Sequence, residues 1–293
     1  MIFIHGFDDH CNRYSEFLSN LANSDILVHS FDQRGWGRSV ARPAEKGLTG
    51  PTSQVLADIT SFIESKLPSP APLFLMGHSM GGQEILMYAA LGPANVTKHI
   101  VGYVAEAPYI RLDDSSQPNG LTVFAGRIVS KLVPNRQMAQ KLYPEFMCHD
   151  EATCKDWEQD ELCHHTGTLE GLAGMLDRAA ALDKGEIEHN EDIRLFIGHG
   201  TGDRVTSHEA TKRFFDRSKV QDKTLKSYDG CYHCSMYRGN DTSRYAYTNI
   251  RKVHLEPEAD RRKFTDDVVE WILTRAKIQS NTTAEAGQTQ SKL

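Results

Sequence analysis

The most constraining feature of the sequence is GHSMGG at residues 77–82, in which Ser79 stands between glycines two positions away on either side. An apolar run at residues 73–76 precedes it, and a helix-like stretch at residues 81–90 follows. A serine on a sharp strand-to-helix turn needs flanking glycines, because larger side chains would clash where strand and helix approach. The pattern therefore predicts a nucleophilic serine at the end of a strand.

Strand-like runs and helical periods alternate along most of the chain. The strand-like runs are residues 1–4, 26–31, 73–76, 100–105, 193–197 and 224–228, and apolar residues recur at helical spacing near 14–21, 55–63, 81–90 and 264–272. Short connections between such elements predict an α/β fold with a mostly parallel, doubly wound sheet flanked by helices.

The alternation breaks at residues 109–188, where the sequence is helix-like. We therefore expect a core formed by residues 1–108 and 189–278, with residues 109–188 inserted as a helical cap. Within the cap, residues 121–133 are apolar on almost all sides. This pattern indicates either a buried cap helix or a surface that contacts lipid or guards an acyl tunnel.

Composition excludes several classes of protein. The 293 residues are 39% hydrophobic and 25% charged, a mixture that can bury a core. The net charge of −6 argues against nucleic acid as the main partner. No apolar run approaches the roughly 20 residues of a transmembrane helix, and no secretory signal is visible. The six cysteines are best interpreted as free thiols, so we expect a soluble intracellular globular protein.

A serine nucleophile needs a base, and the base needs an orienting acid. In doubly wound hydrolases these follow the serine in the order Asp, His, each after a later strand. Asp203 comes just after the strand-like run 193–197, and His233 follows the run 224–228. We therefore predict Asp203 and His233 as the partners of Ser79, with His254 as the alternative histidine.

The oxyanion formed when a serine attacks a carbonyl needs two backbone N–H donors. The N–H of Met80, directly after the nucleophile, is the expected first donor. The loop His5-Gly6-Phe7 follows the first strand-like run, and Gly6 allows the chain to turn so that the N–H of Phe7 becomes the second donor.

Together these residues resemble the monoglyceride lipases, which belong to the serine aminopeptidase S33, or lysophospholipase-like, group of serine hydrolases. The matching segments cover nearly the whole chain: HGFDDHCNRY at 5–14, FDQRGWGRS at 31–39, GHSMGG at 77–82, LCHHTGTLEGLAGML at 162–176, GHGTGDRV at 198–205, YDGCYH at 228–233 and HLEPEADRRKF at 254–264. The resemblance implies an α/β-hydrolase fold with a helical cap and hydrolysis of monoacylglycerol or related acyl esters. It implies Ser79, Asp203 and His233 as the catalytic triad, Phe7 and Met80 as the oxyanion hole, and no metal or organic cofactor.

The sequence departs from the family pattern in two places. Relatives have two or more strands before the HGF loop, whereas here only residues 1–4 precede it, so these strands of the family are expected to be missing. Residues 234–251 separate His233 from the HLEPE segment. Because this segment lacks an apolar period, we predict an exposed loop. It is either a true insertion or a translated intron, and such a loop could displace His233. If the missing strands and this segment together leave the triad unassembled, the protein would be a non-catalytic member of the fold that only binds its ligand.

Two groups of cysteines and histidines could in principle form metal or redox sites. The pair Cys231 and Cys234 has C-x-x-C spacing but lacks a thioredoxin-like context. The cap carries a second group, whose spacing matches no common metal site; its members are Cys148, Cys154, Cys163, His164 and His165. We therefore expect local packing at both places and no metal.

Residues 279–293 are polar and are predicted to form a disordered tail. They end in Ser291-Lys292-Leu293, a peroxisomal address read by an import receptor. The combination resembles the peroxisomal α/β-hydrolases with which fungi make fatty-acid-like secondary metabolites, including host-selective toxins. Hydrolysis of an ester or thioester in such a biosynthesis is therefore the alternative to monoacyl ester hydrolysis, with the cytoplasm as the alternative location.

Overall fold

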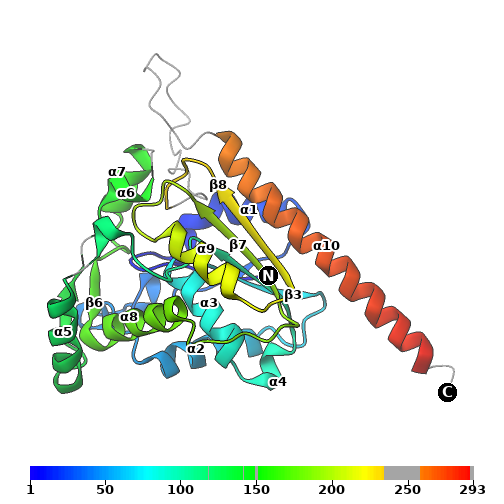
Figure 1. Ribbon diagram of the computed structural model, residues 1–293, viewed down its shortest axis with the longest axis horizontal. Coiled ribbons are helices and arrows are strands. Elements are labelled where there is room, and N and C mark those ends of the chain that lie inside the picture. Colours follow the sequence, from blue (N-terminus) through cyan, green and yellow to red (C-terminus); the bar gives the residue numbers. More distant parts are fainter. Residues whose placement is uncertain (118, 141, 149–150, 234–257, 291–293) are drawn as a thin grey trace, which may run out of the picture.

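The computed structural model describes residues 1–117, 119–140, 142–148, 151–233 and 258–290 (Figure 1). Its centre is a six-stranded sheet in which every neighbouring pair is parallel. The strand order is β2-β1-β3-β4-β7-β8, and the strands are β1 (Ile2–Ile4), β2 (His29–Ser30), β3 (Leu73–His78), β4 (Ile100–Glu106), β7 (Arg194–Gly200) and β8 (Asp222–Tyr228). The prediction of a mostly parallel sheet is confirmed.

Helices cover both faces of this sheet (Figure 1). The core helices are α1 (Ser15–Ala22), α2 (Thr52–Glu64), α3 (Met80–Leu91), α4 (Ala94–Thr97), α9 (His208–Arg217) and α10 (Glu258–Gln290). Because strand side chains alternate between faces, Ile2 and Ile4 pack with α2, α3 and α9, whereas Phe3 packs with α1 and α10. Burial on both faces explains why the inner strands β1 and β3 are rich in apolar residues.

The described residues between β4 and β7 contribute no strand to the main sheet. It contains α5 (Gly120–Leu132), β5 (Gln137–Ala139), α6 (Pro144–Met147), α7 (Glu151–Gln159), β6 (Thr166–Thr168) and α8 (Leu169–Lys184). The antiparallel pair formed by β5 and β6 was not expected. We refer to these elements together as the cap. Helix α8 also packs on the core, where Leu182 is fully buried.

Two predicted boundaries differ from the structure. The strand expected at residues 26–31 is only β2, because just His29 and Ser30 pair with β1 at the sheet edge. Helix α10 continues to Gln290, where a disordered tail was expected from residue 279 (Figure 1). Residues 279–290 contain no apolar stripe, so the sequence showed no helical period there.

Several expectations fall wholly or partly outside the described residues. The segment 234–251, His254 and the terminal residues Ser291, Lys292 and Leu293 belong to this group. Within the described ranges, five cysteines are free thiols: Cys11, Cys148, Cys154, Cys163 and Cys231. No helix of the described part is both long and apolar enough to cross a membrane.

Candidate active site

Ser79 occupies the tight turn between β3 and α3, with backbone angles φ 53° and ψ −114°. This left-handed conformation is rare for a residue with a side chain, and it projects the serine out of the sheet. The flanking glycines are required by space. A Cβ on Gly77 would lie 2.3 Å from the carbonyl oxygen of Gly81, and one on Gly81 would lie 2.3 Å from that of Ile4.

The structure brings Ser79, Asp203 and His233 together. His233 Nε2 lies 2.9 Å from Ser79 Oγ, and His233 Nδ1 lies 2.8 Å from Asp203 Oδ2. The three residues follow β3, β7 and β8, whose carboxyl ends share one edge of the parallel sheet. The backbone N–H of Ser79 also donates to the carbonyl of Glu106, which fixes the turn against β4.

The carboxylate of Asp203 is fully buried and saturated with hydrogen bonds. Its Oδ1 accepts the backbone N–H groups of Val205 (2.7 Å) and Thr206 (2.9 Å). Its Oδ2 accepts the Thr206 hydroxyl at 2.8 Å and lies 3.0 Å from His199 Nε2. Burial alone would raise the pKa of Asp203, but His233 and His199 outweigh it and hold that pKa well below its usual range. The carboxylate therefore stays ionised beside His233.

Several residues that support this arrangement were not predicted from the sequence. His199 and Thr206 both hydrogen-bond to Asp203. Their position within four residues of Asp203 in the chain is the sequence feature that could have identified them. His78 packs against His233 with ring centroids 4.8 Å apart, and its Nδ1 hydrogen-bonds to Glu106. Burial lowers the pKa of His78 to about 4, so its ring is neutral at pH 7.

Phe7 and Met80, the expected oxyanion-hole residues, line the same cavity as Ser79. Met80 is the first residue of α3, so its N–H has no carbonyl partner one turn earlier in the helix. The loop that carries Phe7 is held by His5, whose Nε2 accepts the N–H of Gln33 at 2.9 Å while its Nδ1 donates to the carbonyl of Gly6 at 2.8 Å. Burial lowers the pKa of His5 to about 4.

A cavity of about 510 Å³ opens over Ser79 and His233. The core supplies the floor, and the cap supplies mostly apolar walls, including Val123, Met138, Leu142, Leu172, Met175 and Leu176. A cavity of this volume with mostly apolar cap walls suits a small molecule with an extended apolar part.

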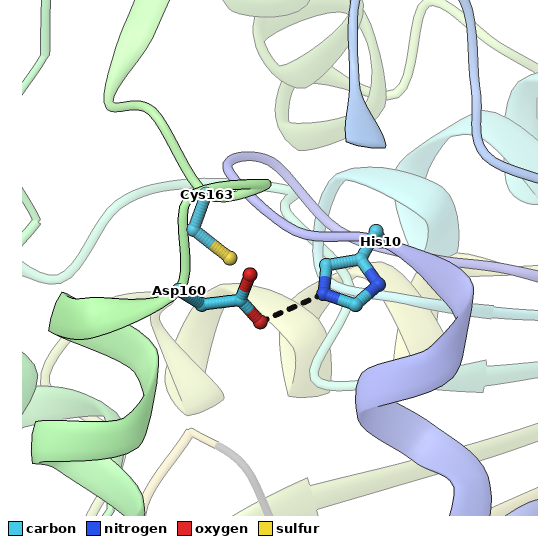
Figure 2. A group of neighbouring side chains, drawn as sticks. All are labelled: His10, Asp160 and Cys163. Carbon is cyan, nitrogen blue, oxygen red and sulfur yellow. Dashed lines mark hydrogen bonds and ion pairs between the residues drawn. The ribbon is translucent and has the colours of Figure 1, made fainter. Parts of the chain in front are cut away.

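Three potential metal ligands, His10, Asp160 and Cys163, meet where the cap contacts the loop after Phe7 (Figure 2). Their ligand atoms lie within 4.8 Å of one another. Of the three, only Cys163 belongs to the cysteine and histidine group of the cap that the sequence singled out. Asp160 Oδ2 lies 2.9 Å from His10 Nε2 and 3.4 Å from a guanidinium nitrogen of Arg13. Because Arg13 already supplies the positive charge at this carboxylate, we interpret the group as a polar contact between cap and core.

Comparison with known proteins agrees with the geometry. Residues 1–238 match the family model for serine aminopeptidase S33. A Schizosaccharomyces pombe protein provisionally named a monoglyceride lipase is 32% identical over 97% of this chain and 70% of its own length. The monoglyceride lipase of Saccharomyces cerevisiae is 28% identical over 80% of this chain and 76% of its own length.

The fold comparison points the same way. A crystal structure of a soluble variant of monoglyceride lipase from Saccharomyces cerevisiae, in complex with a substrate analogue, superimposes with a TM-score of 0.80 at 23% identity. It covers 94% of this chain and 86% of that one. The chain therefore belongs to the serine aminopeptidase S33 family of α/β-hydrolases, and it is a carboxylic-ester hydrolase similar to the monoglyceride lipases.

Proposed function

We propose that the chain hydrolyses carboxylic esters of acyl chains through a triad of Ser79, His233 and Asp203. The observation that supports this most directly is the continuous path of hydrogen-bond distances, 2.9 Å from Ser79 Oγ to His233 Nε2 and 2.8 Å from His233 Nδ1 to Asp203 Oδ2. This assembled geometry favours a working enzyme over a protein that only binds its ligand.

The mechanism follows from this geometry. Ser79 Oγ attacks the acyl carbon while His233 Nε2 accepts its proton, and the ionised Asp203 stabilises the imidazolium. The N–H groups of Phe7 and Met80 donate to the oxyanion. The C–O bond then breaks, His233 returns the proton to the departing alcohol, and an acyl-enzyme remains. Water, deprotonated by His233, attacks the acyl-enzyme and releases the carboxylic acid and Ser79.

The substrates that the site suits best are medium- to long-chain monoacyl esters. Two observations support this choice: the apolar cap walls of the 510 Å³ cavity, and the names of the relatives, which are monoglyceride lipases. Kinetics across acyl length and leaving group test it. We expect kcat/KM to rise from acetyl to decanoyl esters, and a preference for acetyl esters would refute the acyl cavity.

The terminal Ser291-Lys292-Leu293 favours a second candidate, an ester or thioester hydrolase that acts in a peroxisomal biosynthesis of a fatty-acid-like metabolite. This tripeptide would be bound by the import receptor. Deletion of Leu293 should leave the protein diffuse in the cytosol, and unchanged punctate localisation would refute the signal. Faster turnover of acyl thioesters than of monoacylglycerols would favour the biosynthetic role.

Peripheral contact with lipid through the cap is part of the proposal. Helix α5 and the residue after it expose an apolar strip to solvent: Ile128 (51% exposed), Val129 (42%), Leu132 (77%) and Val133 (47%). Because α5 also lines the cavity, a lipid surface at this strip would deliver an acyl chain beside its binding site.

A further inference from the structure

Asp8 directly follows Phe7 and has an unusual conformation. Its φ is 58°, in the left-handed region that glycine adopts most easily, and the residue is fully buried. Aspartate tolerates this conformation better than most residues with side chains do, but burying its carboxylate requires partners. The partners of Asp8 therefore explain why an aspartate stands at this position.

All of these partners come from the cap. Asp8 Oδ1 accepts the backbone N–H groups of His164 and His165, both at 2.6 Å. His165 Nδ1 also lies against Asp8 Oδ2. The indole Nε1–H of Trp157 donates to the carbonyl oxygen of Asp8 at 3.1 Å. The backbone immediately after Phe7 is thus fixed by residues about 150 positions away.

A stack of rings connects the same cap loop to Phe7 itself. The ring of His164 lies parallel to Trp36, at a centroid distance of 4.8 Å and an angle of 5°. Trp36 in turn meets the ring of Phe7 edge-on, at 4.7 Å and 63°. Phe7 is therefore held from two sides, through its following peptide by Asp8 and through its side chain by Trp36.

We propose that Asp8 is a positioning residue that makes the oxyanion hole depend on the docked cap. The proposal rests on the proposed function, because it assigns Asp8 the role of aiming the Phe7 N–H at the reacting carbonyl. An oxyanion hole works only when its donors are placed before the reaction, and a misplacement of about 1 Å can cost about 100-fold in rate. Loss of the cap contacts at Asp8 should therefore reduce kcat and leave ground-state binding intact.

Two substitutions separate the side-chain anchor from the backbone conformation. Asp8→Gly keeps the left-handed backbone without strain and removes the carboxylate. Asp8→Asn keeps an oxygen that can accept both N–H groups, and it tolerates a positive φ. Asp25 provides a matched control, because it also has a positive φ, 62°, but is exposed and lies in the turn after α1.

The readouts are kcat and KM on a p-nitrophenyl ester, the rate of labelling by a fluorophosphonate, and the melting temperature. For Asp8→Gly we expect kcat and the labelling rate to fall together by roughly 10- to 100-fold, with KM within about twofold of the wild-type value. Asp8→Asn should stay within about threefold of wild type, and Asp25→Gly should match wild type. Trp157→Phe, which removes the indole donor and keeps a smaller aromatic ring, should reduce kcat severalfold at constant KM.

Either of two results would overturn the proposal: Asp8→Gly as active as Asp25→Gly, or Asp8→Asn losing as much kcat as Asp8→Gly. If Asp8→Gly does not fold, Trp157→Phe decides, and unchanged kcat in that variant refutes the role of the cap contacts. A wild-type protein that neither hydrolyses esters nor reacts with the fluorophosphonate would instead refute the proposed function.

Discussion

His233 Nε2 lies 2.9 Å from Ser79 Oγ, although the two residues are 154 positions apart in the chain. The sheet order explains this contact, since β3 and β8 are separated by β4 and β7 and all four strands run in the same direction. Their carboxyl ends meet at one edge, so a loop after β8 can reach the turn after β3. A proton can pass between the two side chains over this distance without a bridging water.

Asp203→Asn should lower kcat by about 10⁴-fold with little change in KM, because an amide donor would favour the wrong tautomer of His233. Steady-state kinetics on a soluble ester measure the effect. Asp229→Asn is the control, since Asp229 also follows a strand, directly after β8, but is exposed. Similar kcat values for the two variants would show that Asp203 does not orient the base.

Acid should destabilise the protein through His5. Its pKa is about 4 in the folded state against an ordinary 6.5, so below pH 6.5 the unfolded chain binds a proton that the folded chain excludes. At pH 5 this difference in proton binding lowers the free energy of unfolding by about 2 kcal/mol, and above pH 6.5 the effect vanishes. Urea unfolding at pH 7 and pH 5 tests this. The difference in the free energy of unfolding between the two pH values should be about 2 kcal/mol smaller in His5→Gln than in the wild type. An equal difference in both proteins would contradict this role.

Gly81→Ala should lower the free energy of unfolding by about 3 kcal/mol or more, because the new Cβ would lie 2.3 Å from the backbone oxygen of Ile4. That oxygen cannot move without shifting β1. Gly126→Ala in α5 is the matched control, since its Cβ would meet no atom within 4 Å. That variant should gain up to about 1 kcal/mol from helix propensity. Equal stability changes in the two variants would refute the steric explanation.

Leu132→Ser should weaken binding to phospholipid vesicles by about tenfold, because it removes the most exposed apolar side chain of the strip on α5. Leu27→Ser removes another highly exposed leucine, 68% exposed, that lies outside the cap, and it should leave vesicle binding unchanged. Sedimentation with vesicles measures both. Equal binding by the two variants would argue against lipid contact through α5.

The sequence predicted the elements whose signal is local. The strand-like runs 73–76, 100–105 and 193–197 were identified because residues 73–76, 102–105 and 195–197 within them are buried on both faces of the sheet and are almost all apolar. Ser79 and Asp203 each follow such a strand, and His233 follows the half-exposed strand-like run 224–228. Their order in the chain was enough to select them from the other serines, aspartates and histidines. Their catalytic roles remain predictions.

The features that the sequence did not predict depend on contacts between distant segments. The pairing of β5 with β6 joins two three-residue strands that are too short to show a period. Asp8 is polar and follows a glycine-containing loop, so its burial by His164 and His165 could not be expected without the position of the cap. His78 and Glu106 lie in apolar strands, where their pairing across β3 and β4 depends on register.

The central claim is that Ser79 is the activated nucleophile, and identification of the residue labelled by a fluorophosphonate tests it most directly. The Oγ of an activated serine displaces fluoride from phosphorus and forms a stable adduct. We expect mass spectrometry to find one adduct per chain, on the peptide that contains Ser79, and none in Ser79→Ala. An unlabelled wild-type protein, or an adduct on another residue that persists in Ser79→Ala, would contradict the account.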